Sequence, residues 1–163
     1  MSAAGGEELR AYRDALVRFC LGYVNSAEDA EDAVQDTLVK AASASVRPDN
    51  LRAWLYKVAR NHCLNQRRAR GRRRDAAPLP AGQAAAGTWA GELTRLVRAE
   101  QRSRVAHLVA ALPEGAREVL RLRYIEGLSR AEVAEVLDLP ESVVKSRIYE
   151  ALRKLREHTS LVE

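Results

Sequence analysis

The sequence predicts an all-α fold, with two small helical domains joined by a flexible linker and a helix-turn-helix in the C-terminal domain. Apolar residues recur at the three- and four-residue spacing of helices, and no segment alternates as a strand does. Residues 76–91 are rich in Ala, Gly and Pro and lack this periodicity, which is typical of a linker. A chain of 163 residues also suits two small domains. We therefore expect domains at residues 1–75 and 92–163, with the linker at 76–91.

The first domain is expected to hold three helices. Leu9, Leu16 and Tyr23 follow helical spacing, and Asn25 or Ser26 can cap a second helix that turns Ala30, Val34 and Leu38 inward. Residues 43–50 read as a loop, because Pro48 disfavours a helical conformation at the residue before it. A third helix is expected from about Asn50, with an apolar face that includes Leu55 and Cys63.

The second domain contains the signals of a helix-turn-helix. A helix over 114–126 is followed by Gly127, which tolerates the left-handed conformation at a helix end. Ser129 and Glu132 fit a capping box at the next helix, and residues 138–140 form a turn before the last helix. The alternative is an ordinary pair of antiparallel helices with a solvated polar face. The residues expected on the exposed face of the last helix, where such a helix meets DNA, are Ser142, Lys145, Ser146, Arg147 and Tyr149.

Charge is distributed unevenly along the chain. Residues 1–50 carry five basic and nine acidic side chains, whereas residues 51–75 carry nine basic and one acidic side chain. Concentrated positive charge favours a nucleic-acid partner, and the acidic segment favours a different, basic partner. The chain as a whole has a formal net charge of +5.

The acidic charge falls on the second predicted helix. We place its carboxylates opposite the apolar stripe, although a merely solvated face at a helix N-terminus would look the same. The residues that we single out for binding a partner are Asp29, Asp32, Gln35 and Asp36, next to Glu28 and Glu31.

The basic charge falls on the third predicted helix, where the aromatic residues Trp54 and Tyr56 also lie. Aromatic and amide side chains beside a basic stripe suit unstacked bases and a single-stranded backbone. The alternative is a generic basic surface over a core tryptophan, which we favour for Trp54 itself. The candidate nucleic-acid contacts on this helix are Arg52, Lys57, Arg60, Asn61, Asn65, Arg67 and Arg68.

Other classes of protein find little support. Cys20 and Cys63 lack CxxC spacing and, with the three histidines, form no metal-ligand pattern, so we expect no metal and no cofactor. No phosphate-binding glycine loop, nucleophile elbow or HExxH motif is present, so we expect no enzyme. No apolar run approaches the length of a membrane span, and we expect a soluble, cytoplasmic protein that is not inserted in a membrane.

Three strings resemble a known family. Residues 112–156 resemble the fourth conserved region of extracytoplasmic-function (ECF) sigma factors, and residues 30–41 and 51–68 resemble the second region. The resemblance implies a protein that directs core RNA polymerase to promoters. The acidic helix would bind the clamp helices of the largest polymerase subunit, and the C-terminal domain would face the flap. An anti-sigma factor is a further implied partner.

The resemblance also implies how promoter DNA is read. The loop over 43–50 and the helix with Arg60 and Asn61 would open and read the −10 element. The last helix would read the −35 element, with Lys145, Ser146 and Tyr149 at base-reading positions and Arg147 toward phosphate.

Two departures from the family pattern concern specificity. Glu150 stands where the family often has Arg, and Ala42 stands where an aromatic residue is common, before a loop that looks a few residues short. Two other interpretations remain open at the level of sequence. One is an autonomous helix-turn-helix regulator that dimerises on a palindrome, and the other is an anti-sigma-like decoy that binds polymerase without reading DNA.

Overall fold

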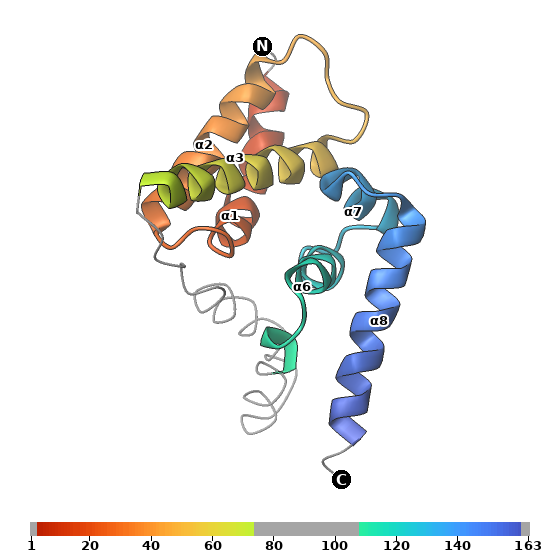
Figure 1. Ribbon diagram of the computed structural model, residues 1–163. Coiled ribbons are helices and arrows are strands. Elements are labelled where there is room, and N and C mark those ends of the chain that lie inside the picture. Colours follow the sequence, from red (N-terminus) through yellow and green to blue (C-terminus); the bar gives the residue numbers. More distant parts are fainter. Residues whose placement is uncertain (1–2, 74–107, 161–163) are drawn as a thin grey trace. The chain divides into compact units, whose positions relative to one another are not determined.

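The computed structural model describes residues 3–73 and 108–160, and both segments consist of helices and their connections (Figure 1). The chain divides into two units, at residues 1–85 and 86–163. The described residues confirm the all-α prediction. The predicted linker at 76–91 lies outside the described residues.

Three helices build the first unit: α1 (Ala3–Cys20), α2 (Ala27–Ser43) and α3 (Leu51–Arg73). Helices α1 and α2 pack against each other, and α3 packs across them (Figure 1). Leu16, Phe19, Val34 and Leu55 are fully buried between the three helices. The apolar faces predicted from helical spacing therefore form one core.

Aromatic packing in this core corrects one expectation. Tyr56 is 2% exposed, and its ring lies edge-to-face with that of Phe19 at a centroid distance of 5.0 Å. Phe19 makes a similar contact with Tyr23 at 5.1 Å. Tyr56 is thus part of the hydrophobic core, where its ring is unavailable to an unstacked base.

Local hydrogen bonds fix where α2 and α3 begin. The hydroxyl oxygen of Ser26 accepts the backbone N–H of Asp29 at 3.0 Å, which confirms Ser26 as the N-cap of α2. The carboxamide oxygen of Asn50 accepts the backbone N–H of Ala53 at 3.0 Å at the start of α3. Ser26 thus fixes the start of α2, and Asn50 fixes the start of α3, where the loop between the two helices ends.

The second unit contains α6 (Glu114–Leu120), a π-helical turn η2 (Arg121–Ile125), α7 (Arg130–Leu137) and α8 (Glu141–Ser160). A short helical turn at 108–110 precedes them. The fully buried residues of this unit include Val119, Leu122, Leu128, Val133, Val136 and Val144. Helix α8 packs against both α6 and α7.

The predicted turn and cap signals are confirmed in this unit. Gly127 has a φ of 68°, in the left-handed region that a β-carbon disfavours. Ser129 and Glu132 form the complete capping box of α7. Asp138 ends α7 with a φ of 53°, and α8 begins at Glu141, directly after Pro140.

The segment after α6 differs from the regular helix expected through Glu126. The backbone N–H of Glu126 donates to the carbonyl of Arg121, five residues earlier, at 3.1 Å. The side chains of these two residues are both buried, and Arg121 Nε lies 3.7 Å from Glu126 Oε1. The widened turn thus brings an ion pair inside the unit, and residue periodicity alone does not reveal such a turn.

Candidate functional site

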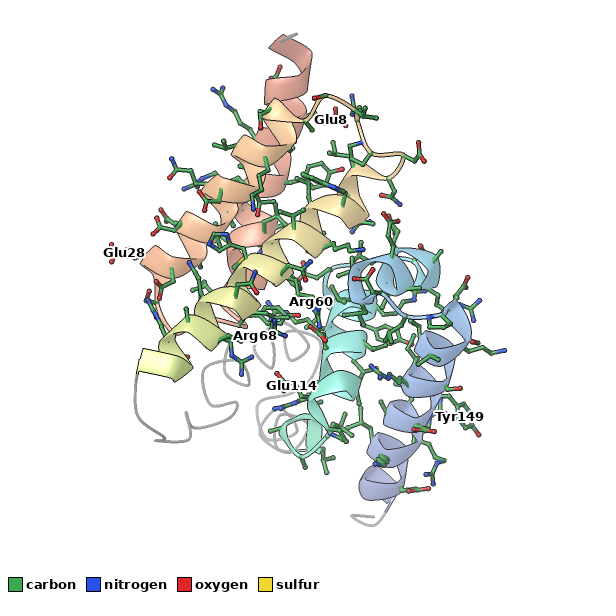
Figure 2. All side chains as sticks on the ribbon, turned by 45° about the horizontal axis from the view of Figure 1, so that its top comes forward. Glu8, Glu28, Arg60, Arg68, Glu114 and Tyr149 are labelled. Carbon is green, nitrogen blue, oxygen red and sulfur yellow. The ribbon has the colours of Figure 1, made fainter. Side chains whose placement is uncertain are left out.

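The second helix of the helix-turn-helix, α8, exposes most of its predicted DNA-binding residues. Ser142, Lys145, Ser146 and Tyr149 are exposed, and the Tyr149 side chain is 67% exposed on the outer side of the helix (Figure 2). Positions three and four apart lie on one face of a helix, so these side chains form one surface. Hydroxyl, ammonium and phenol groups on such a surface can contact base edges and phosphates in a major groove.

Arg147 lies differently from the other residues of this set. It is half-buried, and a β-carbon added at Gly115 would lie only 3.2 Å from its Nη1 atom. The guanidinium therefore rests against the start of α6, in space that the absent side chain of Gly115 provides. Arg147 was expected on the exposed face of this helix, and part of its side chain also packs within the unit.

Acidic side chains interrupt the positive charge around α8. Glu150 is exposed, one residue after Tyr149. Arg130, at the start of α7, lies 3.6 Å from Glu141 at the start of α8. Arg153 forms an ion pair with Glu157 at 2.5 Å. Arg130 and Arg153 thus already have carboxylate neighbours.

Helix α3 carries the basic surface of the first unit. Asn61, Asn65 and Arg68 are exposed, whereas Arg52, Lys57, Arg60 and Arg67 are half-buried. Figure 2 labels Arg60 and Arg68, two turns apart on this helix. Long basic side chains often cover apolar surface with their stems and keep the charge in water. Trp54 is half-buried beside them, between the core and the surface.

The acidic surface on α2 is exposed with one exception. Glu28, Glu31, Asp32, Gln35 and Asp36 are all exposed. Two basic side chains from neighbouring helices lie beside them: Arg13 Nη2 is 3.7 Å from Glu31, and His62 Nδ1 is 3.5 Å from Asp36. These contacts are weak because both partners of the first pair and Asp36 of the second are well exposed.

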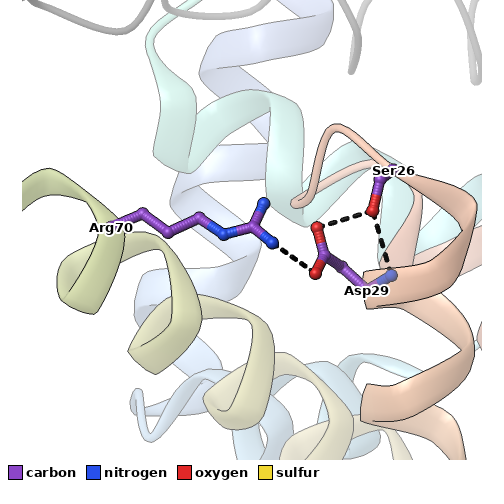
Figure 3. Close-up of polar contacts among 3 residues, drawn as sticks. All are labelled: Ser26, Asp29 and Arg70. Atoms are coloured by element: carbon purple, nitrogen blue, oxygen red, sulfur yellow. Dashed lines mark hydrogen bonds and ion pairs between the residues drawn. The ribbon is translucent and has the colours of Figure 1, made fainter. Parts of the chain in front are cut away.

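Asp29 is the exception, and this corrects its predicted place on the exposed acidic face. Its side chain is 12% exposed, and the carboxylate accepts a hydrogen bond from the Ser26 hydroxyl at 2.6 Å. The other carboxylate oxygen accepts a hydrogen bond from Arg70, near the end of α3 (Figure 3). The Ser26 hydrogen bond and then Arg70 hold the pKa of Asp29 below its ordinary value, although burial acts in the opposite direction.

Arg70 is the partner that the sequence did not reveal. It lies 41 positions after Asp29, at the point where α3 passes the start of α2. In the sequence it is one of many arginines in the stretch 67–74, and nothing distinguishes it from Arg67 or Arg68. Arg70 is the partner of Asp29 because the crossing of α3 over α2 places it beside that carboxylate.

The part of the chain that the structure describes shows neither a metal site nor a membrane helix. No group of three or more His, Cys, Asp or Glu side chains is arranged for a metal within the described residues. Within the same residues, every helix is too short or too polar to cross a bilayer.

Comparison with known proteins identifies both units with parts of one family. Residues 9–73 match the family model of sigma-70 region 2, and residues 102–155 match that of sigma-70 region 4. The first match spans α2 and α3, and the second spans α6, α7 and most of α8.

Individual relatives match most of the chain. The RNA polymerase sigma-H factor of Pseudomonas aeruginosa is 31% identical over 150 residues, which cover 86% of this chain and 78% of the relative. The ECF RNA polymerase sigma-E factor of Escherichia coli strain K12 is 33% identical, with the same coverage.

Two solved structures are similar over nearly the whole chain. CnrH, in complex with the cytosolic domain of CnrY, has a TM-score of 0.63 at 29% identity and covers 98% of this chain and 90% of its own. The sigma factor RpoE of Bartonella quintana, in complex with the anti-sigma factor NepR, has a TM-score of 0.63 at 25% identity and covers 96% and 97%.

Proposed function

This chain belongs to the ECF sigma factors of the sigma-70 family, and we propose that its exposed surfaces on α2, α3 and α8 make the contacts that the function needs. The function itself is to direct RNA polymerase to promoters. Sigma factors are not enzymes, and we propose that this chain likewise acts by binding alone, in the cytoplasm with the polymerase. The two domains are proposed to be residues 1–75 and 92–163, joined at 76–91.

The acidic surface on α2 is proposed to bind the clamp helices of the polymerase. Asp32, Gln35 and Asp36 support this role because all three are exposed on one helix. Exposed carboxylates attract a basic partner and speed its association, an effect that salt weakens. Asp29 was also predicted from the sequence to bind this partner, but its hydrogen bonds to Ser26 and Arg70 give it a role in joining α2 to α3.

The basic surface on α3 is proposed to bind the −10 element as a single strand. Arg60, Asn61, Asn65 and Arg68 support this role, together with the half-buried Arg52, Lys57 and Arg67. Arginine and lysine neutralise phosphates, and the amides can hydrogen-bond to bases that are no longer paired. With Tyr56 in the core, Trp54 is the aromatic residue of this helix that remains partly accessible.

Helix α8 is proposed to read the −35 element in the major groove. The observation that carries this assignment is the exposed set Ser142, Lys145, Ser146 and Tyr149 on the second helix of a capped helix-turn-helix. Arg147 is proposed to reach phosphate from its place beside Gly115. Glu150 is proposed to weaken one backbone contact, since its carboxylate repels phosphate.

Each DNA-binding surface is small, so we propose that promoter affinity depends on polymerase. Core polymerase would hold the two domains over their two elements at once and raise their effective concentration. The flap is proposed to receive the C-terminal domain. An anti-sigma factor is a further proposed partner, because the Bartonella RpoE was solved in complex with the anti-sigma factor NepR. CnrH was likewise solved with a protein partner, the cytosolic domain of CnrY.

Co-purification with core polymerase tests the proposed role of α2. We expect the chain to bind core polymerase and the Asp32→Lys, Asp36→Lys double variant to bind at least ten-fold more weakly, since two attractions become repulsions. The double variant Glu7→Lys, Asp14→Lys reverses two exposed carboxylates of α1, with the same total change of charge; it is the control and should bind normally. Equal binding by both variants would contradict the assignment. A chain that dimerises on a palindrome and ignores polymerase would favour an autonomous regulator.

A further inference from the structure

The loop over residues 44–50 joins α2 to α3 and is held firmly at its two ends. The Ser43 hydroxyl donates to the carbonyl of Val39 at 2.8 Å, and Asn50 caps α3. Between these ends, Ala44, Ser45 and Val46 are exposed, and Val46 is 80% exposed. Apolar burial therefore contributes little to fixing the middle of this loop.

One ion pair connects the middle of the loop to α1. Arg47 Nη2 donates to Glu8 Oε2 at 2.6 Å, across 39 positions of sequence. The pair exists because α1 and α2 run in opposite directions, which brings the start of α1 beside the end of α2, and Figure 2 labels Glu8 at that place. The side chains are 65% and 43% exposed, so water and salt reach both partners.

An exposed ion pair of this kind is easily exchanged. Water competes for both charges and salt screens them, so the pair holds its arginine only weakly. A phosphate group is a strong alternative acceptor, because a guanidinium can donate two parallel hydrogen bonds to it. The loop runs directly into α3, where Arg52 opens the basic surface that we assign to single-stranded DNA.

Within the loop that the resemblance assigns to the −10 element, we infer that Glu8 competes with the DNA backbone for the guanidinium of Arg47. In the free protein, Glu8 neutralises Arg47 and restrains the loop. When the −10 strand binds along α3, Arg47 exchanges the carboxylate for a phosphate, and the loop becomes free to follow the strand. The inference rests on the proposed −10 role of α3.

The test uses holoenzyme assembled from core polymerase and the full chain. Its binding to a labelled single-stranded DNA is measured, with the non-template −10 sequence of a promoter at which the wild-type protein initiates. We expect Arg47→Gln to weaken binding and Glu8→Gln to strengthen it, each by about two- to five-fold at low salt. Glu7→Gln is the control, because Glu7 is an exposed neighbour of the same charge.

The double variant separates a specific exchange from a general effect of charge. We expect the increase in DNA affinity caused by Glu8→Gln to disappear in the Arg47→Gln background and to become smaller as the salt concentration rises. Because Glu8 and Arg47 are exposed, the melting temperature should change little in any of these variants. A gain that persists without Arg47, or an equal gain from Glu7→Gln, would overturn the inference.

The same experiment distinguishes this inference from the function on which it rests. Normal initiation without coupling between Glu8 and Arg47 refutes the exchange alone. A wild-type holoenzyme that initiates at the promoter but does not bind the single-stranded −10 DNA refutes the proposed −10 role and the exchange with it.

Discussion

Replacing Asp29 with asparagine keeps the shape of this side chain and removes the charge that joins α2 to α3. The carboxylate accepts hydrogen bonds from Ser26 and from Arg70 while its side chain is only 12% exposed. A hydrogen bond to a charged group contributes about 1.5–3 kcal/mol, but Arg70 is 55% exposed, so we take a value near or below the lower end of that range. The expected loss is about 1–2 kcal/mol of the free energy of unfolding.

Thermal and urea unfolding of the full chain measure this loss. In a Trp89→Phe background, Trp54 is the single tryptophan, so its fluorescence reports on the first unit. For a domain of this size, about 1.5 kcal/mol corresponds to a melting temperature lower by about 6–12 °C. Asp32→Asn is the matched control, because Asp32 is exposed on the same helix, and it should change stability by less than about 0.5 kcal/mol.

The effect should also depend on pH in a defined direction. The pKa of Asp29 is lowered in the folded state, so its contribution is complete above the unfolded pKa of about 4 and is lost as the pH falls through the folded pKa. The difference in unfolding free energy between wild type and Asp29→Asn should therefore be constant from about pH 7 to pH 5 and narrow below about pH 4.

Two results would refute this reasoning. One is a cost for Asp29→Asn that is no larger than that of Asp32→Asn, which would mean that the hydrogen bonds contribute nothing net. The other is a stability difference that widens in acid. Arg70→Gln, alone and combined with Asp29→Asn, isolates the ion pair, and we expect a coupling of about 0.5–1 kcal/mol.

The remaining predictions concern the second unit. Ser129→Ala should cost about 1 kcal/mol of unfolding free energy, because the Ser129 hydroxyl oxygen accepts the N–H of Glu132 at 3.1 Å; a urea midpoint equal to wild type would contradict this. Gly127→Ala should cost about 1 kcal/mol or more in the same measurement, because its φ is 68°. Lys145→Ala in the holoenzyme should weaken promoter binding by about 1–3 kcal/mol if Lys145 contacts a base, or by less if it contacts a phosphate. Unchanged promoter choice would show that α8 is misassigned. Glu150→Gln should strengthen binding to −35 DNA, most at low salt, and no gain at any salt would remove Glu150 from the DNA-facing surface.

Signals that act over three or four residues were predictable from the sequence. The Ser26 cap and the left-handed Gly127 each depend on one residue type at one position, and the capping box of α7 depends on two residues three positions apart. Helical spacing likewise predicted the inward face of α2, since Ala30 and Val34 are buried. The all-α class followed because these local signals agree with each other.

Features that depend on how helices cross were not predictable in the same way. Spacing on α2 allows Asp29 to face either water or α3, and only the crossing with Arg70 determines which. Tyr56 lies in a basic stretch of sequence, yet its ring packs on Phe19 from another helix. Arg147 rests on α6 because Gly115 leaves room there. Which residues of the proposed site bind DNA or polymerase stays a prediction.

Run-off transcription with purified core polymerase tests the central claim most directly. Core polymerase with and without this chain is offered fragments of the source genome, and the start points of the transcripts are mapped. We predict discrete start sites that require the chain, preceded by shared −35 and −10 sequences at a constant spacing, and shifted preference at the −35 element with Lys145→Ala. Core polymerase that binds the chain but initiates at no additional site would contradict the account.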